Sequence, residues 1–480
     1  MRNPRATRPI STFRRANALL LFIFLLALAL RAMELPQSAG LPGPGVIADV
    51  VCASDTTQSY ALYLPSGYVP GKNWPIIYFF DPGGHGRRPL ELYKDLADQY
   101  GFIFAGSNNS RNFSSEQSKS VNAIWLDTHI RLPLDEHRTY VSGFSGGARV
   151  AGAMALTCSK CGIAGVIAHG AGYPSSKSQS DDRLLYFFSI GNEDFNWPEI
   201  MSVRREREEH GQPYRVHVFS GPHQWGPHIV MEDALQWLTL KAMQAGTMKP
   251  DPDFVERAFQ QIQAEAREAE KANDVLAQFD AVRSLSVDFS GLRDTGDATA
   301  RLNALKQSSA LKSARKAERD AINDQFSLES EISPKLRTYA EGSEPDPAAL
   351  QREIQQAMGR LQEQALHAKN ESKRLVFKRA LEDMWAEGIE NGQQELAARH
   401  FDKAESCFQL MSLVRDQPWP FLLLAQTHVA QGRNKDALRD LQQSVHHGLK
   451  DPSILESNPD FQALKNEPEF QKLISQLKNP

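Results

Sequence analysis

The sequence predicts an α/β domain with a mostly parallel sheet and helices on both sheet faces, followed by an all-α region. Residues 46–243 alternate short apolar runs with amphipathic stretches, a pattern typical of parallel strands that helices cover on both sides. After about residue 250 the strand signals nearly vanish, and charged stretches carry apolar residues at steps of three and four. The chain of 480 residues is also too long for one ordinary core, so we expect two or three domains.

The N-terminal residues 1–39 have the composition of a secretory signal peptide. Five arginines precede an uninterrupted apolar run at 18–30, and a polar, proline-bearing stretch follows. We therefore expect a secreted or periplasmic protein that keeps no stable membrane span after cleavage, at a site that the sequence does not mark. The apolar run is shorter than the roughly 20 residues that span a bilayer, so an uncleaved anchor is the alternative.

The α/β domain is predicted to cover residues 46–245. Each predicted strand is short and apolar and is followed by Gly, Asn, Ser or Pro, which favour turns. The predicted strands are 60–64, 75–80, 102–105, 138–141, 164–168, 184–190 and 214–219, and the predicted helices are 90–100, 120–132 and 148–156.

The motif Gly143-Phe144-Ser145-Gly146-Gly147 joins the predicted strand 138–141 to the predicted helix 148–156. In this context the pattern G-x-S-x-G predicts a nucleophile elbow, a sharp strained turn that presents the serine side chain. The residues two before and two after the serine must be almost free of side chain so that strand and helix can approach. Glycine at both positions meets that demand, and Ser145 is the predicted nucleophile.

A serine hydroxyl needs a base, and the base needs an acid that orients it. Two predicted loops follow strands after the elbow, at the carboxyl ends where an open α/β sheet places its site. The first loop contains Asp194 and the second contains His223. The order Ser, Asp, His is the one that this architecture requires. We therefore predict a catalytic triad of Ser145, Asp194 and His223.

Three other residues compete for these roles. Glu193 precedes Asp194 and replaces it if the predicted strand register is wrong by one residue. His217 lies inside a predicted strand, which favours a packed or edge position, and His228 lies where a helix should begin. His223 is preferred because turn residues surround it and let the ring project from its loop.

An ester or amide carbonyl also needs donors for the oxygen that becomes negative in the tetrahedral intermediate. The backbone N–H of Gly146, directly after the serine, is the first predicted donor of this oxyanion hole. The second should come from the loop 81–86, which follows an early strand. Pro82 has no N–H, so we expect Gly83 or Gly84 to supply it.

Residues 46–243 resemble the α/β-hydrolase fold and, within it, secreted carboxylic-ester hydrolases of the polyhydroxybutyrate-depolymerase and feruloyl-esterase type. The resemblance rests on the segments 60–68 and 135–147 and on the loops at Gly191 and His223. It implies a serine carboxylic-ester hydrolase that works through an acyl-enzyme intermediate, without a cofactor. The serine would be the nucleophile, the histidine the general base and acid, and the aspartate the orienting carboxylate.

One departure from those esterases concerns the oxyanion loop, which has Asp81-Pro82 where they usually carry His-Gly. This difference bears on the substrate more than on the fold. The segment 173–183 is short and polar where many lipases insert a lid, which favours an open site for soluble or polymeric esters. A serine peptidase of the same fold and a catalytically degenerate interaction protein remain as alternatives.

The C-terminal part of the chain is predicted to be helical throughout. Residues 246–252 form a predicted linker, residues 253–340 a helical spacer with a solvated charged face, and residues 341–347 a second break. Residues 348–480 form the last predicted domain.

This last domain contains a weak internal repeat, in which 401–408 is echoed by 434–441. The spacing resembles the tetratricopeptide repeat, in which a small residue lets paired helices approach and a large apolar residue four positions later fills the gap. Gly432 fits the turn between two such helices, and Phe461, Leu464 and Phe470 fit a capping segment. The resemblance implies a module that docks a protein partner.

The net charge argues against a nucleic-acid-binding protein, and the cysteine spacing argues against a metal site. The net charge of −4 and the sequence pI of about 6.4 argue against a nucleic-acid partner, which a basic surface would indicate. Four cysteines, Cys52, Cys158, Cys161 and Cys407, would meet an oxidising compartment. Because no second C-x-x-C pair exists, we expect no metal site, and a disulfide within the pair 158/161 or one to Cys52 is preferred.

Overall fold

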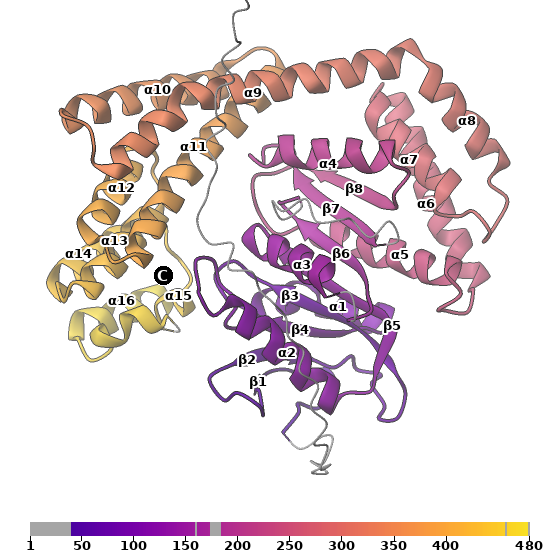
Figure 1. Ribbon diagram of the computed structural model, residues 1–480, viewed down its shortest axis with the longest axis horizontal. Coiled ribbons are helices and arrows are strands. Elements are labelled where there is room, and N and C mark those ends of the chain that lie inside the picture. Colours follow the sequence, from indigo (N-terminus) through magenta and orange to yellow (C-terminus); the bar gives the residue numbers. More distant parts are fainter. Residues whose placement is uncertain (1–39, 159–160, 173–183, 457, 479–480) are drawn as a thin grey trace, which may run out of the picture. The chain divides into compact units, whose positions relative to one another are not determined.

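The computed structural model describes residues 40–158, 161–172, 184–456 and 458–478 (Figure 1). The predicted signal peptide at 1–39 and the segment 173–183 therefore lie outside the described residues. Residues 40–480 form a single unit. None of the helices in the described part is long and apolar enough to cross a membrane.

An eight-stranded, mostly parallel sheet forms the centre of the α/β domain, in the order β1-β2-β4-β3-β5-β6-β7-β8. The first two strands pair antiparallel, β2 pairs antiparallel with β4, and the remaining pairs are parallel. All predicted strands are confirmed, and β1 is an addition, because this half-exposed edge strand with an aspartate at its centre lacks an apolar run. The strands are Ile47–Val51, Ser59–Tyr63, Trp74–Phe80, Ile103–Ser107, Leu134–Phe144, Ile163–His169, Leu185–Gly191 and Tyr214–Phe219, numbered β1 to β8.

Five helices cover the two faces of this sheet. Alternate residues of β3 point to opposite sides, so Tyr78 packs with α2, α3 and α4 and Phe79 packs with α1 and α5. The predicted fold class is thereby confirmed as the α/β-hydrolase fold followed by an all-helical region. Helix α4 was not predicted, because its many arginine and glutamate residues obscure the amphipathic pattern that indicates a helix packed on a sheet. The helices are Arg87–Tyr100, Gln117–Arg131, Gly146–Thr157, Trp197–Glu209 and His228–Gln244, numbered α1 to α5.

The rest of the described chain is helical, as predicted. The stretch 254–284 is divided into α6 and α7 by Asn273, which has a positive φ of 55°. Helix α9 continues for 33 residues, through Pro334, to the predicted break at 341–347. The helices are Pro252–Lys271, Val275–Val287, Gly296–Gln307, Ser309–Glu341, Pro347–His367, Glu371–Ala397, Phe401–Val414, Pro418–Ala430, Asn434–His446, Ser453–Glu456 and Pro468–Lys478, numbered α6 to α16, with a 3-10 turn η1 at Pro459–Leu464.

Helices α6, α7 and α9 pack against the α/β domain, and α8 joins the same apolar cluster. Apolar residues of α5 join those of α6, α7 and α8 in one buried cluster. Beside it, Arg215 of β8 forms an ion pair with Asp233 of α5 at 2.6 Å and donates to Ser284 of α7 at 3.0 Å. Arg204 of α4 binds both carboxylate oxygens of Glu318 of α9, at 2.6 and 2.8 Å. The solvated spacer that the sequence suggested is thus attached to the sheet by buried contacts.

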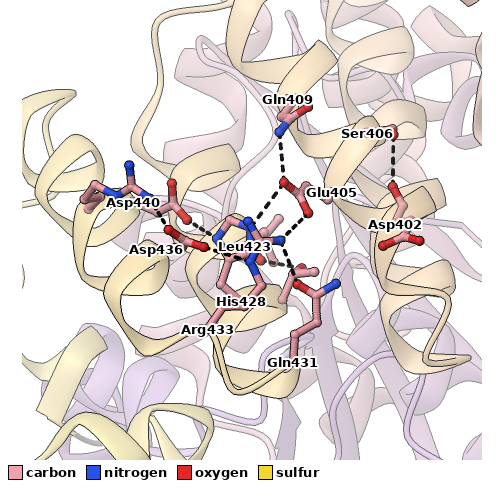
Figure 2. Close-up of polar contacts among 12 residues, drawn as sticks. Asp402, Glu405, Ser406, Gln409, Leu423, His428, Gln431, Arg433, Asp436 and Asp440 are labelled. Carbon is pink, nitrogen blue, oxygen red and sulfur yellow. Dashed lines mark hydrogen bonds and ion pairs between the residues drawn. The ribbon is translucent and has the colours of Figure 1, made fainter.

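The last helices pack as antiparallel neighbours around small residues. Ala404 and Ala437 are fully buried, Gly432 turns the chain between α13 and α14 with a φ of 76°, and Phe461 and Phe470 are buried in the terminal cluster. Figure 2 shows the polar contacts that join these helices: the ring of His428 on α13 lies 3.3 Å from Glu405 of α12 and 2.5 Å from Asp440 of α14. The assignment to tetratricopeptide repeats stays a prediction.

The disulfide lies within the C-x-x-C pair, which is one of the two pairings that the sequence left open. Cys158 is bonded to Cys161 at the end of α3, and Cys52 and Cys407 are buried free thiols. Burial raises the pKa of both thiols to about 12, so neither is reactive.

The buried ion pair of Arg215, the residue that also donates to Ser284 of α7, is open to a direct test. Replacing Arg215 by alanine leaves the buried Asp233 without its arginine partner and with only His217 beside it, and we expect Arg215→Ala to lose about 3 kcal/mol of unfolding free energy, measured by urea denaturation. Arg301→Ala is the control, because its pair with Glu270 is exposed and should change stability by less than about 0.5 kcal/mol. Equal, small effects of both variants would contradict a structural role for the buried pair.

Candidate active site

Ser145 occupies the turn between the last residue of β5 and the first residue of α3. Its φ of 53° and ψ of −121° are unusual for a residue with a side chain, and such strain persists only where the surroundings enforce it. The Ser145 N–H donates to the carbonyl of His169 at the end of β6, at 2.8 Å, and its own carbonyl accepts from Ala148 at 3.0 Å. The predicted strand-to-helix elbow is therefore present.

The glycines around the serine have no room for a side chain. A Cβ on Gly143 would lie 2.3 Å from the carbonyl of Gly147, and a Cβ on Gly147 would lie 1.9 Å from the carbonyl of Phe80 in β3. These are backbone atoms, which cannot move aside as a flexible side chain can. The glycine pattern thus has the structural cause that the sequence suggested, a close approach of the strand β5 and the helix α3. The structure adds the neighbouring strand β3, whose backbone the Gly147 position also touches.

The predicted acid and base lie together in the loops after β7 and β8. His223 Nδ1 lies 2.9 Å from Asp194 Oδ2, and the Asp194 side chain is fully buried. The other carboxylate oxygen, Oδ1, accepts from the Asn196 N–H at 2.9 Å. A carboxylate on Nδ1 favours the tautomer that leaves Nε2 free to accept a proton.

The competing residues have other partners. Glu193 pairs with Lys378 of α11 at 2.5 Å, which leaves Asp194 as the carboxylate on the histidine. His217, on the edge strand β8, is bound to Asp233 of α5 at 2.8 Å, and His228 begins α5, where it pairs with Asp95. Both histidines match the alternative positions that the sequence indicated for them.

The His223 ring lies between two phenylalanine rings beside the elbow. The centroids of Phe144 and Phe195 are 4.5 and 4.4 Å from that of the imidazole. Phe144 directly precedes Ser145, and a Cβ on Gly170 would touch Phe144, Asp194 and His223 within 3.1 Å. Among the described residues the Ser145 hydroxyl makes no hydrogen bond to His223, a contact that often tightens only in a substrate complex.

The N–H groups of the predicted oxyanion loop form hydrogen bonds within the loop itself. Gly83 donates to Asp81 Oδ1 at 2.8 Å, and Gly84 donates to the Asp81 carbonyl at 3.0 Å. Asp81 is itself buried and also accepts from Trp225 at 3.0 Å. Burial acts to raise the pKa of this carboxyl, but hydrogen bonds from His85, Trp225 and Gly83 outweigh it and the pKa is lowered. The loop is therefore built around an ionised carboxylate that engages the Gly83 N–H, while the Gly84 N–H is engaged by the backbone carbonyl of the same aspartate.

Asn112, which sequence reasoning missed, lies against the elbow. A Cβ on Gly146 would be 2.0 Å from Asn112 Oδ1 and 2.7 Å from Nδ2, so the amide group touches the residue after the serine. The Asn112 N–H donates to the carbonyl of Pro82 at 2.8 Å, which joins this loop to the oxyanion loop. The next residue, Phe113, is half exposed and has a positive φ of 59°, a second strained position beside the site.

A cavity of about 420 Å³ adjoins the site at Phe195, which is one of its lining residues. Helices α9 and α11 supply its other walls, including Phe326 and four carboxylates, those of Glu329, Asp383, Glu387 and Glu390. Burial, together with the neighbouring carboxylates, raises the pKa of Asp383 to about 8. Residues of α9 and α11 thus line a cavity beside Phe195, whose ring contacts His223. The sequence patterns did not indicate that these helices lie there.

No three histidine, cysteine, aspartate or glutamate side chains in the described part of the chain cluster as a metal ion would need.

Comparisons with known proteins give similarities of fold. No family model matches the chain, and no curated protein matches it either. Among solved structures, S-formylglutathione hydrolase from Staphylococcus aureus is 12% identical, with 41% of this chain and 98% of that chain covered at a TM-score of 0.33. A ferulic acid esterase is 15% identical, with 40% and 96% covered at a TM-score of 0.33. An esterase from the Planctomycetes species Thermogutta terrifontis is 15% identical, with 44% and 98% covered at a TM-score of 0.34. Similarities this distant say nothing about the activity of this chain.

The raised pKa of Asp383 predicts how stability changes with pH. The folded protein keeps this proton up to about pH 8, whereas the unfolded chain releases it near pH 4, so stability should fall as pH rises through this window. Asp383→Asn removes the ionisable group and with it the fall in stability at high pH. We therefore expect the variant to be more stable than the wild type by roughly 2 kcal/mol at pH 9 and equally stable at pH 4. Urea unfolding at both pH values measures this difference. The exposed Asp324→Asn on α9 is the control, and a variant that is destabilised equally at both pH values would contradict the assignment.

Proposed function

We propose that the chain is a serine hydrolase that cleaves carboxylic esters through Ser145, His223 and Asp194. The observation that carries the proposal is the hydrogen bond between His223 and the buried Asp194, beside a serine held at positive φ on a strand-to-helix turn. These are the three parts of a nucleophile, base and orienting acid in the order of this fold. The resemblance of the sequence to secreted esterases supports the ester as substrate class.

The reaction follows from the roles of these groups. The Ser145 Oγ attacks the ester carbonyl while His223 Nε2 takes its proton, and Asp194 stabilises the resulting imidazolium through Nδ1. The tetrahedral intermediate collapses as the imidazolium returns the proton to the departing alcohol oxygen, which leaves Ser145 acylated. Water then attacks the acyl carbon and gives a proton to His223. The second tetrahedral intermediate collapses as the imidazolium returns this proton to Ser145 Oγ, which releases the carboxylic acid and regenerates the free serine.

The oxyanion needs two donors aimed at the same point. Gly146 is the first, because its N–H lies at the N-terminus of α3, where no side chain caps the helix and the helix dipole favours negative charge. For the second, the sequence indicated Gly83 or Gly84, both of which already donate to Asp81. We propose that the Asn112 amide takes this role, since it lies beside Gly146 and its backbone N–H is bonded to the carbonyl of Pro82 in the oxyanion loop.

The remaining parts of the sequence interpretation stay predictions. They are a secreted or periplasmic location, with an uncleaved N-terminal anchor as the alternative, and the docking of a protein partner by the helices after residue 348.

The central test is a serine substitution. We expect the purified protein to hydrolyse p-nitrophenyl butyrate and to be labelled by a fluorophosphonate, and Ser145→Ala to lower kcat by about 1,000-fold or more and to abolish labelling. Ser142→Ala, two residues before Phe144 in the same strand, is the matched control and should keep both properties. A wild type that is inert in both assays would refute the proposal, and equal turnover of matched amides would favour a peptidase.

The second oxyanion donor is tested separately. We expect Asn112→Ala to lower kcat by about 100-fold with little change in KM, because the donor acts on the transition state and not on the ground state. Ser115→Ala, in the exposed part of the same loop, should leave kcat unchanged. If Asn112→Ala keeps wild-type kcat while Ser145→Ala does not, the second donor belongs to the loop 81–86.

A further inference from the structure

The loop that carries Asp194 is held from outside the α/β domain. Helices α9 and α11, more than a hundred residues further along the chain, reach its backbone on both sides of the aspartate. Arg379 Nη1 of α11 donates to the carbonyl of Asn192 at 3.0 Å. Gln325 Nε2 of α9 donates to the carbonyl of Phe195 at 3.1 Å.

These two side chains also bind each other. Arg379 Nε donates to Gln325 Oε1 at 3.0 Å, so one hydrogen-bonded chain runs from Asn192 through both helices to Phe195. Gln325 has no exposed surface and Arg379 is 3% exposed. The guanidinium also lies over the ring of Trp197, with 5.0 Å between its carbon and the ring centroid. The two residues are therefore fixed in position, as an anchor for another group must be.

A buried guanidinium is costly, which points to a specific use. Burial lowers the pKa of Arg379 to about 10, and the charges of Glu318, Glu329 and Asp194 act against that effect. An apolar residue of similar length would fill the space without desolvating a charge. An apolar residue would lack the two directed N–H donors of Arg379. One of them binds the carbonyl of Asn192 directly, and the other binds Gln325, which in turn donates to the carbonyl of Phe195.

We propose that Arg379 and Gln325 are positioning residues for the catalytic acid and base. Together they fix the loop 192–195, which sets the direction of Asp194 toward His223 and holds the Phe195 ring against the imidazole. The helical region is then a working part of the catalytic site in addition to any docking role. This inference rests on the proposed hydrolase function and extends it to α9 and α11.

The kinetic test uses substitutions that keep volume and remove donors. Arg379→Met and Gln325→Leu should each lower kcat for p-nitrophenyl butyrate by about tenfold or more with KM within about twofold, because a misplaced base affects the transition state. The double variant should lose little more than either single variant, since both act through one hydrogen-bonded chain. Arg379→Lys should recover part of the loss, because lysine restores one donor. Arg374→Met is the matched control on the same helix; its pair with Glu371 lies within α11, and kcat should not change.

A second readout does not depend on turnover. The proton on His223 Nδ1, shared with Asp194, should give a low-field proton resonance in the wild type that disappears in His223→Gln and weakens or shifts in Arg379→Met. Folded Arg379→Met and Gln325→Leu with wild-type kcat and an unchanged resonance would overturn the inference. If the wild type proves inert to ester and fluorophosphonate, the proposed function fails, and the resonance alone decides whether the two helices position the pair. If Arg379→Met does not fold, Arg379→Lys and Gln325→Leu decide.

Discussion

The close approach of three backbone segments at the elbow is the constraint on which the site depends. The carbonyl of Phe80 in β3 lies where a Cβ of Gly147 would stand, and the backbone of Gly147 lies where a Cβ of Gly143 would stand. With these contacts, and with the Ser145 N–H bound to His169, the serine cannot relax to an ordinary φ. The N-terminus of α3 is thereby brought to the carboxyl edge of the sheet, where the loops of Asp194 and His223 meet.

The parts of this arrangement that follow from local chemistry could be predicted from the sequence. A fully buried strand such as β3 is apolar at every position, which gives a strong signal. The glycines at 143 and 147 report on steric contacts that no other residue permits. The edge strand β1 and the charged helix α4 escaped prediction because each is stabilised by its neighbours, and neither has the pattern of an element that is buried on a full face.

The parts that depend on contacts between distant segments could not be predicted. Nothing in the sequence around Asn112 marks it as a neighbour of Gly146, since the proximity arises from the crossing of two loops. The engagement of the Gly83 N–H by the Asp81 carboxylate likewise depends on the burial of that carboxylate, which also accepts from Trp225. Arg379 lies in a stretch of mixed charges that resembles any solvated helix, and only the fold reveals that its guanidinium is buried.

The position of Arg379 in the chain has a consequence for biosynthesis. A ribosome makes His223 first and reaches this arginine only after the whole of α9 and α10 has been polymerised. At ordinary elongation rates of about 5 to 20 residues per second, roughly 7 to 27 s pass between the synthesis of the end of α5 and that of Arg379. A nascent or prematurely terminated chain therefore carries Ser145, Asp194 and His223 while it lacks the two helices that bind the loop of Asp194. This loop acquires its full set of hydrogen bonds only after the C-terminal half of the chain has emerged.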